Sequence, residues 1–136
     1  MTGRSAAHLA LGRRGEQAAE ALLAAKGYAI VAHNYATREG EIDLICLDGE
    51  TVVFVEVKTR GPGSRARPDQ AVTAAKRGRL VRAGAAFLSE RGWWERPCRF
   101  DVVTVLVRDD RPEVRHLPHA FSLEDAAGTG GLYQPG

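Results

Sequence analysis

Residues 40–58 read GEIDLICLDGETVVFVEVK, with an Asp-Gly pair between two apolar runs. Both runs, at residues 41–47 and 51–58, are rich in the β-branched and apolar side chains that are typical of strands. An Asp-Gly pair in this position predicts a two-residue hairpin turn, with Leu47 opposite Glu50. The segment therefore predicts two adjacent antiparallel strands.

Charged side chains gather on one face of this predicted hairpin. Side chains alternate between the two faces of a strand, so Glu56 and Lys58 share one face and the valines between them take the other. With a two-residue turn, Asp43 lies opposite Phe54 and diagonal to Glu56. A three-residue loop would place Asp43 on the valine face, where an unpaired carboxylate is costly. We therefore expect Asp43, Glu56 and Lys58 to cluster.

These three residues offer the groups needed for metal-assisted hydrolysis. Asp43 and Glu56 supply the hard oxygen ligands that Mg²⁺ or Mn²⁺ prefers, and the ammonium of Lys58 can orient or help to deprotonate a water. This is chemistry for hydrolysing a phosphodiester. The alternative is that Glu56 and Lys58 form a solvated pair on the open face of an antiparallel sheet. The pattern alone leaves both interpretations open.

Further elements are expected on both sides of the hairpin. By periodicity they are a helix over residues 9–26, a short strand over 28–31, a second helix ending near Ser89 and a strand over 99–107. Gly27 and Gly92 stand where helix caps belong, and Asp69 or Thr73 could cap the start of the second helix. A polar connection is expected over residues 33–39. No element is expected beyond His116.

Length and composition are those of a single small domain. The 136 residues, 44% of them hydrophobic, suit one core, which we expect to span residues 1–125. Residues 126–136 are Gly-rich and predict a disordered tail. No apolar run approaches the roughly 18 residues of a membrane span, so we expect a soluble, cytoplasmic protein with no membrane partner. Cys46 and Cys98 show no paired spacing and predict reduced thiols.

Positive charge is concentrated in the middle of the chain. Residues 58–82 carry a net charge of +7 and the rest of the chain −5, giving the overall +2. Such a surface can face nucleic-acid phosphates, or it can be a solvated helix face. The candidate nucleic-acid contacts are Arg60, Arg65, Arg67, Lys76, Arg77 and Arg79. For Lys76 the pattern favours the solvated position.

Two features near the end of the chain have structural explanations. Asp101 shares a strand face with Arg99, so an internal ion pair is expected. His116 and His119 have metal-like spacing, but without partner ligands they do not predict a zinc site.

Four motifs together resemble a known family. They are Gly12-x-x-Gly15-Glu16-x-x-Ala19, Gly40-Glu41-Ile42-Asp43-Leu44-Ile45, Phe54-Val55-Glu56-Val57-Lys58-Thr59-Arg60 and Arg99-Phe100-Asp101-Val102-Val103. Over residues 11–121 the chain resembles the YraN-like family of uncharacterised bacterial proteins. That family is similar to the PD-(D/E)xK, or restriction-endonuclease-like, superfamily and distantly to archaeal Holliday-junction resolvases. The resemblance implies an α/β fold with an α-β-β-β-α-β core, in which helices flank a central mixed sheet.

The resemblance also implies roles for individual residues. It makes Asp43 and Glu56 the ligands of Mg²⁺ or Mn²⁺, Lys58 the catalytic lysine, and Glu16 a helix carboxylate directed at the same site. For Glu16 the alternative is an ordinary exposed helix residue, as Glu20 is one turn later.

The expected function is that of a metal-dependent endonuclease. Its substrate would be DNA rather than RNA, with branched or single-stranded structures as candidates. The alternative is a catalytically silent module that binds nucleic acid within a processing complex, because a fold can be kept without its activity. A homodimer is expected only by analogy with junction resolvases.

Overall fold

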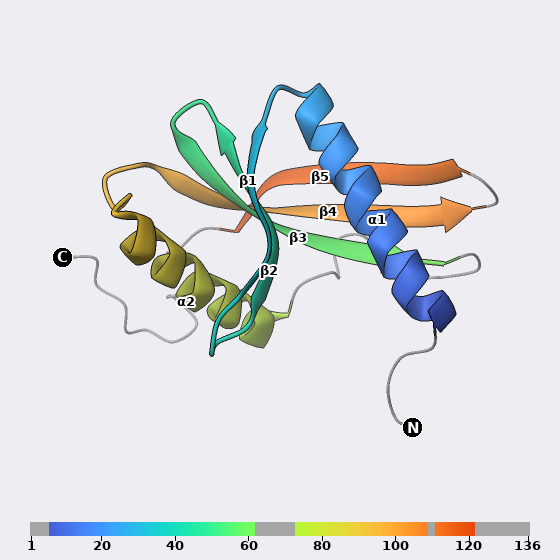
Figure 1. The fold of residues 1–136 in the computed structure, drawn as a ribbon, viewed down its shortest axis with the longest axis horizontal. Coiled ribbons are helices and arrows are strands. Elements are labelled where there is room, and N and C mark those ends of the chain that lie inside the picture. Colours follow the sequence, from blue (N-terminus) through green and yellow to red (C-terminus); the bar gives the residue numbers. More distant parts are fainter. Residues whose placement is uncertain (1–5, 62–72, 109–110, 122–136) are drawn as a thin grey trace.

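Two helices and five strands make up residues 6–61, 73–108 and 111–121, the part of the chain that the computed structural model describes. In chain order they are α1 (Ala6–Ala25), β1 (Ala29–Ala36), β2 (Glu41–Asp48), β3 (Thr51–Arg60), α2 (Ala74–Arg91), β4 (Cys98–Arg108) and β5 (Arg111–Phe121). In Figure 1, α1 and α2 lie toward opposite ends of β3 and β4. Neither described helix is long and apolar enough to cross a membrane. The expected tail at residues 126–136 lies outside the described residues.

The five strands form one sheet in the order β1-β2-β3-β4-β5. Neighbouring strands are antiparallel except β3 and β4, which run parallel. A parallel pair needs a crossover connection, and α2 provides it. The expected α/β fold, with a mixed sheet and flanking helices, is therefore confirmed.

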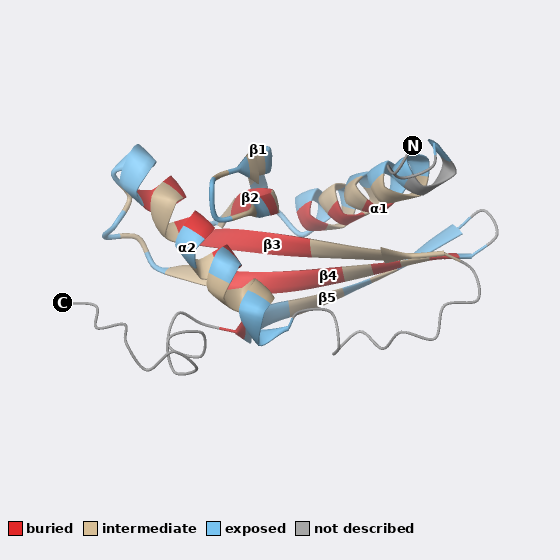
Figure 2. Cartoon of the chain, turned by 90° about the horizontal axis from the view of Figure 1, so that it is seen from below, coloured by how far each residue is buried: buried red, intermediate tan, exposed pale blue. Residues whose placement is uncertain are grey.

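Alternating side chains of β3 build a core on each face of the sheet. Phe54 packs edge-on against Phe87 of α2, with ring centroids 6.0 Å apart. Val53 and Val55 face the other way and belong to the cluster that contains Leu23 of α1. Figure 2 shows the resulting buried segments of β3 and β4. The charged end of β3 begins where this doubly covered segment ends.

The two edge strands differ from the sequence-based prediction. β1 continues to Ala36, through part of the connection expected at residues 33–39. β5 runs from Arg111 to Phe121, although no element was expected beyond His116. Neither edge strand shows the nearly continuous burial of β3, and β5 contains Pro112 and Pro118. Polar residues and prolines are tolerated at a sheet edge. The apolar patterns that reveal buried strands are therefore weak in both.

The β2–β3 hairpin has the predicted turn length but a different turn. Asp48 pairs with Thr51, so the two loop residues are Gly49 and Glu50. Gly49 has a φ of 63°, and a glycine at the first central position is what a type II′ turn requires. The predicted register is therefore wrong by two residues along β3. Because this shift is even, each side chain keeps its predicted face.

Helix α1 lies very close to β3 at Gly15. A Cβ built at Gly15 would overlap Thr59 Oγ1 and lie 2.8 Å from Thr59 Cβ, whereas one at Gly12 would meet nothing within 4 Å. We expect Gly15→Ala to lower the free energy of unfolding by about 1–3 kcal/mol, despite the better helix propensity of alanine. Urea denaturation should show no such loss for the control, Gly12→Ala. Equal stability of the two variants would contradict this close packing.

Candidate active site

The strands β2 and β3 separate at the level of Asp43. Their pairing ends at Leu44 and Val55, and Figure 1 shows the two strands diverging from there. The Val57 N–H donates to Asp43 Oδ2 at 2.7 Å. A backbone N–H that has left the ladder needs another acceptor, and the carboxylate supplies it. Asp43 is thereby held in the space between the two diverging strands, which we call the fork.

Glu56 lies in the same fork and is compensated by two lysines. Val55 pairs with Leu44, so the next residue of β3, Glu56, follows at the level of Asp43, where the predicted register had placed Phe54. Only 4% of the Glu56 side chain is exposed, and its Oε2 lies 3.4 Å from Lys58 Nζ and 2.8 Å from Lys76 Nζ. A buried carboxylate without such partners would be strongly destabilising. The two ammonium groups therefore offset the cost of burying the Glu56 carboxylate.

The fork opens into a cavity of about 430 Å³. Helix α1 contributes Glu16, as the resemblance implied, and α2 closes another side. The charged lining residues are Glu16, Glu41, Asp43, Glu56, Lys58, Arg60, Lys76 and Arg79. The cavity thus joins four acids with four cationic side chains, an arrangement that can hold a cation beside an anionic substrate.

Burial, together with repulsion among the acids, raises the pKa of two carboxyl groups of the cavity. Burial, followed by the negative charge of Glu56, raises the pKa of Asp43 from 3.8 to about 7, although the Val57 N–H acts in the opposite direction. Burial and the charge of Glu41 raise the pKa of Glu16. A cation bound among these acids would relieve the repulsion.

Asp43→Asn is expected to stabilise the protein at pH 8. Because the folded pKa of Asp43 is raised, stability should fall as the pH rises from about 4 to about 7, where the unfolded chain has released the proton that the folded state holds. Asparagine keeps an oxygen for the Val57 N–H. Urea denaturation should show a gain of roughly 1–3 kcal/mol at pH 8 and little difference at pH 4. An Asn variant no more stable than wild type at pH 8 would contradict this assignment.

The predicted nucleic-acid contacts do not all meet at the cavity. Three of them line it: Arg60, Lys76 and Arg79. Arg77 does not line the cavity, and its guanidinium lies 5.7 Å from the centroid of the Phe121 ring. Arg65 and Arg67 lie outside the described residues.

One polar influence on Glu16 was not anticipated from the sequence. Asn34 on β1 has a φ of 49°, and its side chain acts to lower the pKa of Glu16, against the larger effect of burial. Asparagine is among the residues that adopt this backbone conformation most readily. Asn34 thus favours the charged form of the α1 carboxylate.

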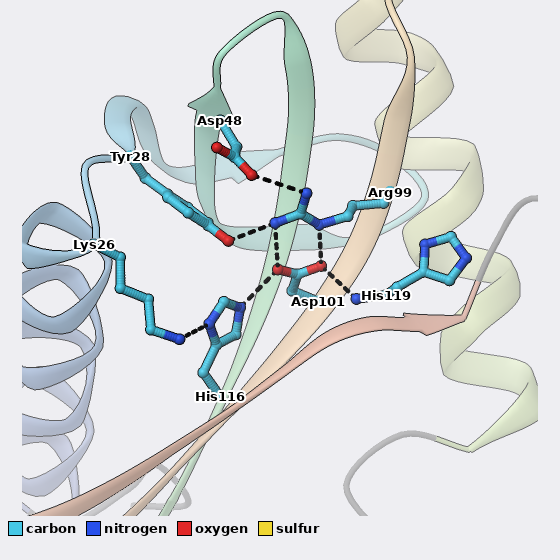
Figure 3. A network of polar contacts seen from close by, with 7 residues as sticks. All are labelled: Lys26, Tyr28, Asp48, Arg99, Asp101, His116 and His119. Carbon is cyan, nitrogen blue, oxygen red and sulfur yellow. Dashed lines mark hydrogen bonds and ion pairs between the residues drawn. The ribbon is translucent and has the colours of Figure 1, made fainter.

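A second polar cluster surrounds Asp101, apart from the cavity (Figure 3). Its residues are Lys26, Tyr28, Asp48, Arg99, Asp101, His116 and His119. The buried Asp101 carboxylate accepts from Arg99 Nε at 3.0 Å and from His116 Nε2 at 2.7 Å. It also accepts the His119 N–H at 2.8 Å. The expected ion pair between Arg99 and Asp101 is therefore confirmed.

The partners of His116 define its hydrogen-bonding state. Lys26 Nζ donates to His116 Nδ1 at 2.8 Å, so Nε2 carries the hydrogen that is donated to Asp101. Burial alone would raise the pKa of Asp101, but the hydrogen bonds from His116 and Arg99 outweigh it and lower the pKa. Both ring nitrogens of His116 therefore form hydrogen bonds within this cluster.

The carboxylates of Asp43 and Glu56 are oxygen donors of the kind that a hard divalent cation prefers. Among the side chains that the structure describes, no three His, Cys, Asp or Glu residues are grouped so as to hold an ion. An ion held by Asp43 and Glu56 would therefore complete its shell with water and backbone oxygens. Mg²⁺ is commonly bound in this way, by one or two carboxylates and several waters.

Together, the fold and the cavity define a mixed α/β protein whose acid- and lysine-lined cavity lies between two diverging strands. The chain belongs to the family described as uncharacterised protein family UPF0102, whose model matches residues 15–105. The family expected from the motifs is therefore confirmed. The matched range includes every charged residue of the cavity.

Relatives of this chain come from several bacteria. It is 46% identical to a UPF0102 protein of Oleidesulfovibrio alaskensis over 128 residues, which cover 94% of this chain and 61% of that protein. It is 44% identical to one of Anaeromyxobacter dehalogenans, with 88% of this chain and 89% of the relative covered. A UPF0102 protein of Symbiobacterium thermophilum is 49% identical over 112 residues, covering 82% of this chain and 95% of the relative.

Proposed function

We propose that this chain is a metal-dependent nuclease that hydrolyses phosphodiester bonds in DNA. The observation that carries the proposal is the meeting of Asp43, Glu56 and Lys58 in one cavity, at the point where β2 and β3 separate. The order of elements from α1 to β4 is also that of the α-β-β-β-α-β core implied by the resemblance to PD-(D/E)xK nucleases. Both observations support the same assignment of residues.

In this proposal each charged residue near the fork has its own role in the reaction. Asp43 and Glu56 would hold Mg²⁺ or Mn²⁺, and the Val57 N–H fixes the orientation of the Asp43 carboxylate. A bound cation of this kind stabilises charge on the phosphate and acidifies a water. Lys58, whose Nζ lies 3.4 Å from Glu56, orients the attacking water and offsets negative charge at the reacting phosphate. Glu16 adds a third acid from α1.

The cationic side chains of the cavity would bind the substrate backbone. Arg60 and Arg79 line the same cavity as the acids, so phosphates bound by them would lie near the proposed metal ligands. The preference for DNA over RNA, and for branched or single-stranded forms, rests on the resemblance to junction resolvases.

A second candidate, a silent nucleic-acid-binding module, is favoured by one observation. The charge of Glu56 is compensated by Lys58 and Lys76. If these pairs persist in solution, the cavity binds phosphate through its cations and cuts nothing. This candidate predicts salt-sensitive binding without turnover.

The deciding experiment compares cleavage with binding on the same substrates. Labelled linear, single-stranded, flap and four-way-junction DNA, with matched RNA, would be incubated with Mn²⁺, Mg²⁺ or a chelator. Wild type should cut DNA only with a metal, and Asp43→Asn, purified in parallel, should not. Equal cleavage by both proteins would indicate a contaminant. Tight binding by wild type with no product under any condition would favour the silent module.

A further inference from the structure

The closest ion pair to Glu56 comes from outside its own strand. Lys76 Nζ lies 2.8 Å from Glu56 Oε2, compared with 3.4 Å for Lys58. Glu56 is one of the two proposed metal ligands. An ammonium at this distance occupies space and neutralises charge on the very carboxylate that a divalent cation would need.

The position of Lys76 in its helix is unfavourable on local grounds. It lies in the first turn of α2, where Thr73 Oγ1 accepts its backbone N–H at 3.2 Å and where no acidic residue is present. The positive end of a helix dipole destabilises a cation there. Local helix chemistry therefore gives no reason for a lysine at this position. The carboxylate across the cavity gives one.

Of the two lysines, Lys76 is the more exposed to solvent. Its side chain is 37% exposed, compared with 23% for Lys58. Lys58 follows Glu56 by two residues on the same strand face, so its backbone keeps it near the carboxylate. Lys76 reaches Glu56 from α2 through a flexible four-carbon side chain and can turn to solvent.

We infer that Lys76 is a resident counter-ion of the cavity, which a divalent metal must displace from Glu56 in order to bind. This inference rests on the proposed function and adds a control to its metal site. The two cations compete for one carboxylate. Lys76 therefore sets how tightly the protein binds its metal.

A metal titration tests this competition without reference to cleavage. The intact protein would be titrated with Mn²⁺ at pH 8, and free Mn²⁺ measured by electron paramagnetic resonance. Lys76→Met keeps the aliphatic length and removes the charge, so it should bind Mn²⁺ about tenfold more tightly than wild type. Lys76→Gln should do the same, which covers the case that the Met variant does not fold. Arg82→Met, which removes a charge from α2 outside the cavity, should match wild type.

The outcomes separate this inference from the proposed function. If wild type binds Mn²⁺, Asp43→Asn does not, and the Lys76 variants bind no more tightly, the competition is overturned and the metal site stands. An equal gain in Arg82→Met would reduce the effect to overall charge and also overturn the competition. If neither wild type nor the Lys76 variants bind Mn²⁺, both the metal site and the competition fail.

Discussion

Asp101→Ala is expected to lower the free energy of unfolding by about 3–5 kcal/mol, because it leaves charged and polar groups buried without their partner. The lost carboxylate is fully buried and pairs with both Arg99 and His116. Only 17% of the Arg99 side chain and 2% of the His116 side chain are exposed, so water cannot replace the lost acceptor. The His119 N–H loses its acceptor as well.

Urea denaturation at pH 7 would measure this loss, with Asp48→Ala as the matched control. Asp48 contacts the same Arg99 at 3.1 Å, but its side chain is 48% exposed, so its removal should cost less than about 1 kcal/mol. The pKa of Asp101 is lowered by folding, so its contribution is present above about pH 4 and is lost as the pH falls further. Similar losses in the two variants would mean that the burial of Asp101 does not determine its contribution to the free energy of unfolding.

Lys58→Ala is expected to reduce the single-turnover rate of metal-dependent DNA cleavage by about 10²–10⁴-fold. The reason is the proposed role of its ammonium, 3.4 Å from Glu56, in orienting the attacking water. DNA binding, measured by fluorescence anisotropy, should change little because Arg60 and Arg79 remain in the cavity. The effect should therefore appear in the rate at saturating protein and not in the binding constant.

The control for Lys58→Ala is Arg115→Ala, which removes one positive charge from an exposed position on β5. It should cut DNA at the wild-type rate. If Lys58→Ala cuts at the wild-type rate and loses only affinity, Lys58 is a phosphate contact and not the catalytic lysine. A parallel fall in both variants would point to overall charge.

The grouping of the site residues could be predicted because it depends on the alternation of side chains between the two faces of a strand. Asp43, Glu56 and Lys58 fell on one face because any two-residue turn preserves the side of each residue. The register within that face depended on whether Gly49 was the first or second residue of the turn, and both arrangements suit an Asp-Gly pair. The sequence therefore predicted the cluster but placed β3 two residues out of its observed register with β2.

Contacts made across the fold could not be predicted in the same way. Lys76 meets Glu56 only because α2 packs over the sheet as the crossover to β4, a relation that no local pattern contains. His116 meets Asp101 only because β5 exists, and its prolines and exposed residues hid that strand. By contrast, the pair of Arg99 with Asp101 lies within one strand, so alternation sufficed.

The cluster around Asp101 also bears on how this protein folds during synthesis. Its members come from the connection between α1 and β1, the end of β2, β4 and β5, with β5 the last described strand to leave the ribosome. Until His116 emerges, a nascent chain would have to bury Asp101 with part of its compensation missing. The core around β4 therefore cannot reach its final stability one element at a time. Folding of the described region is completed only once β5 is available, and until then its partly built core is exposed to aggregation.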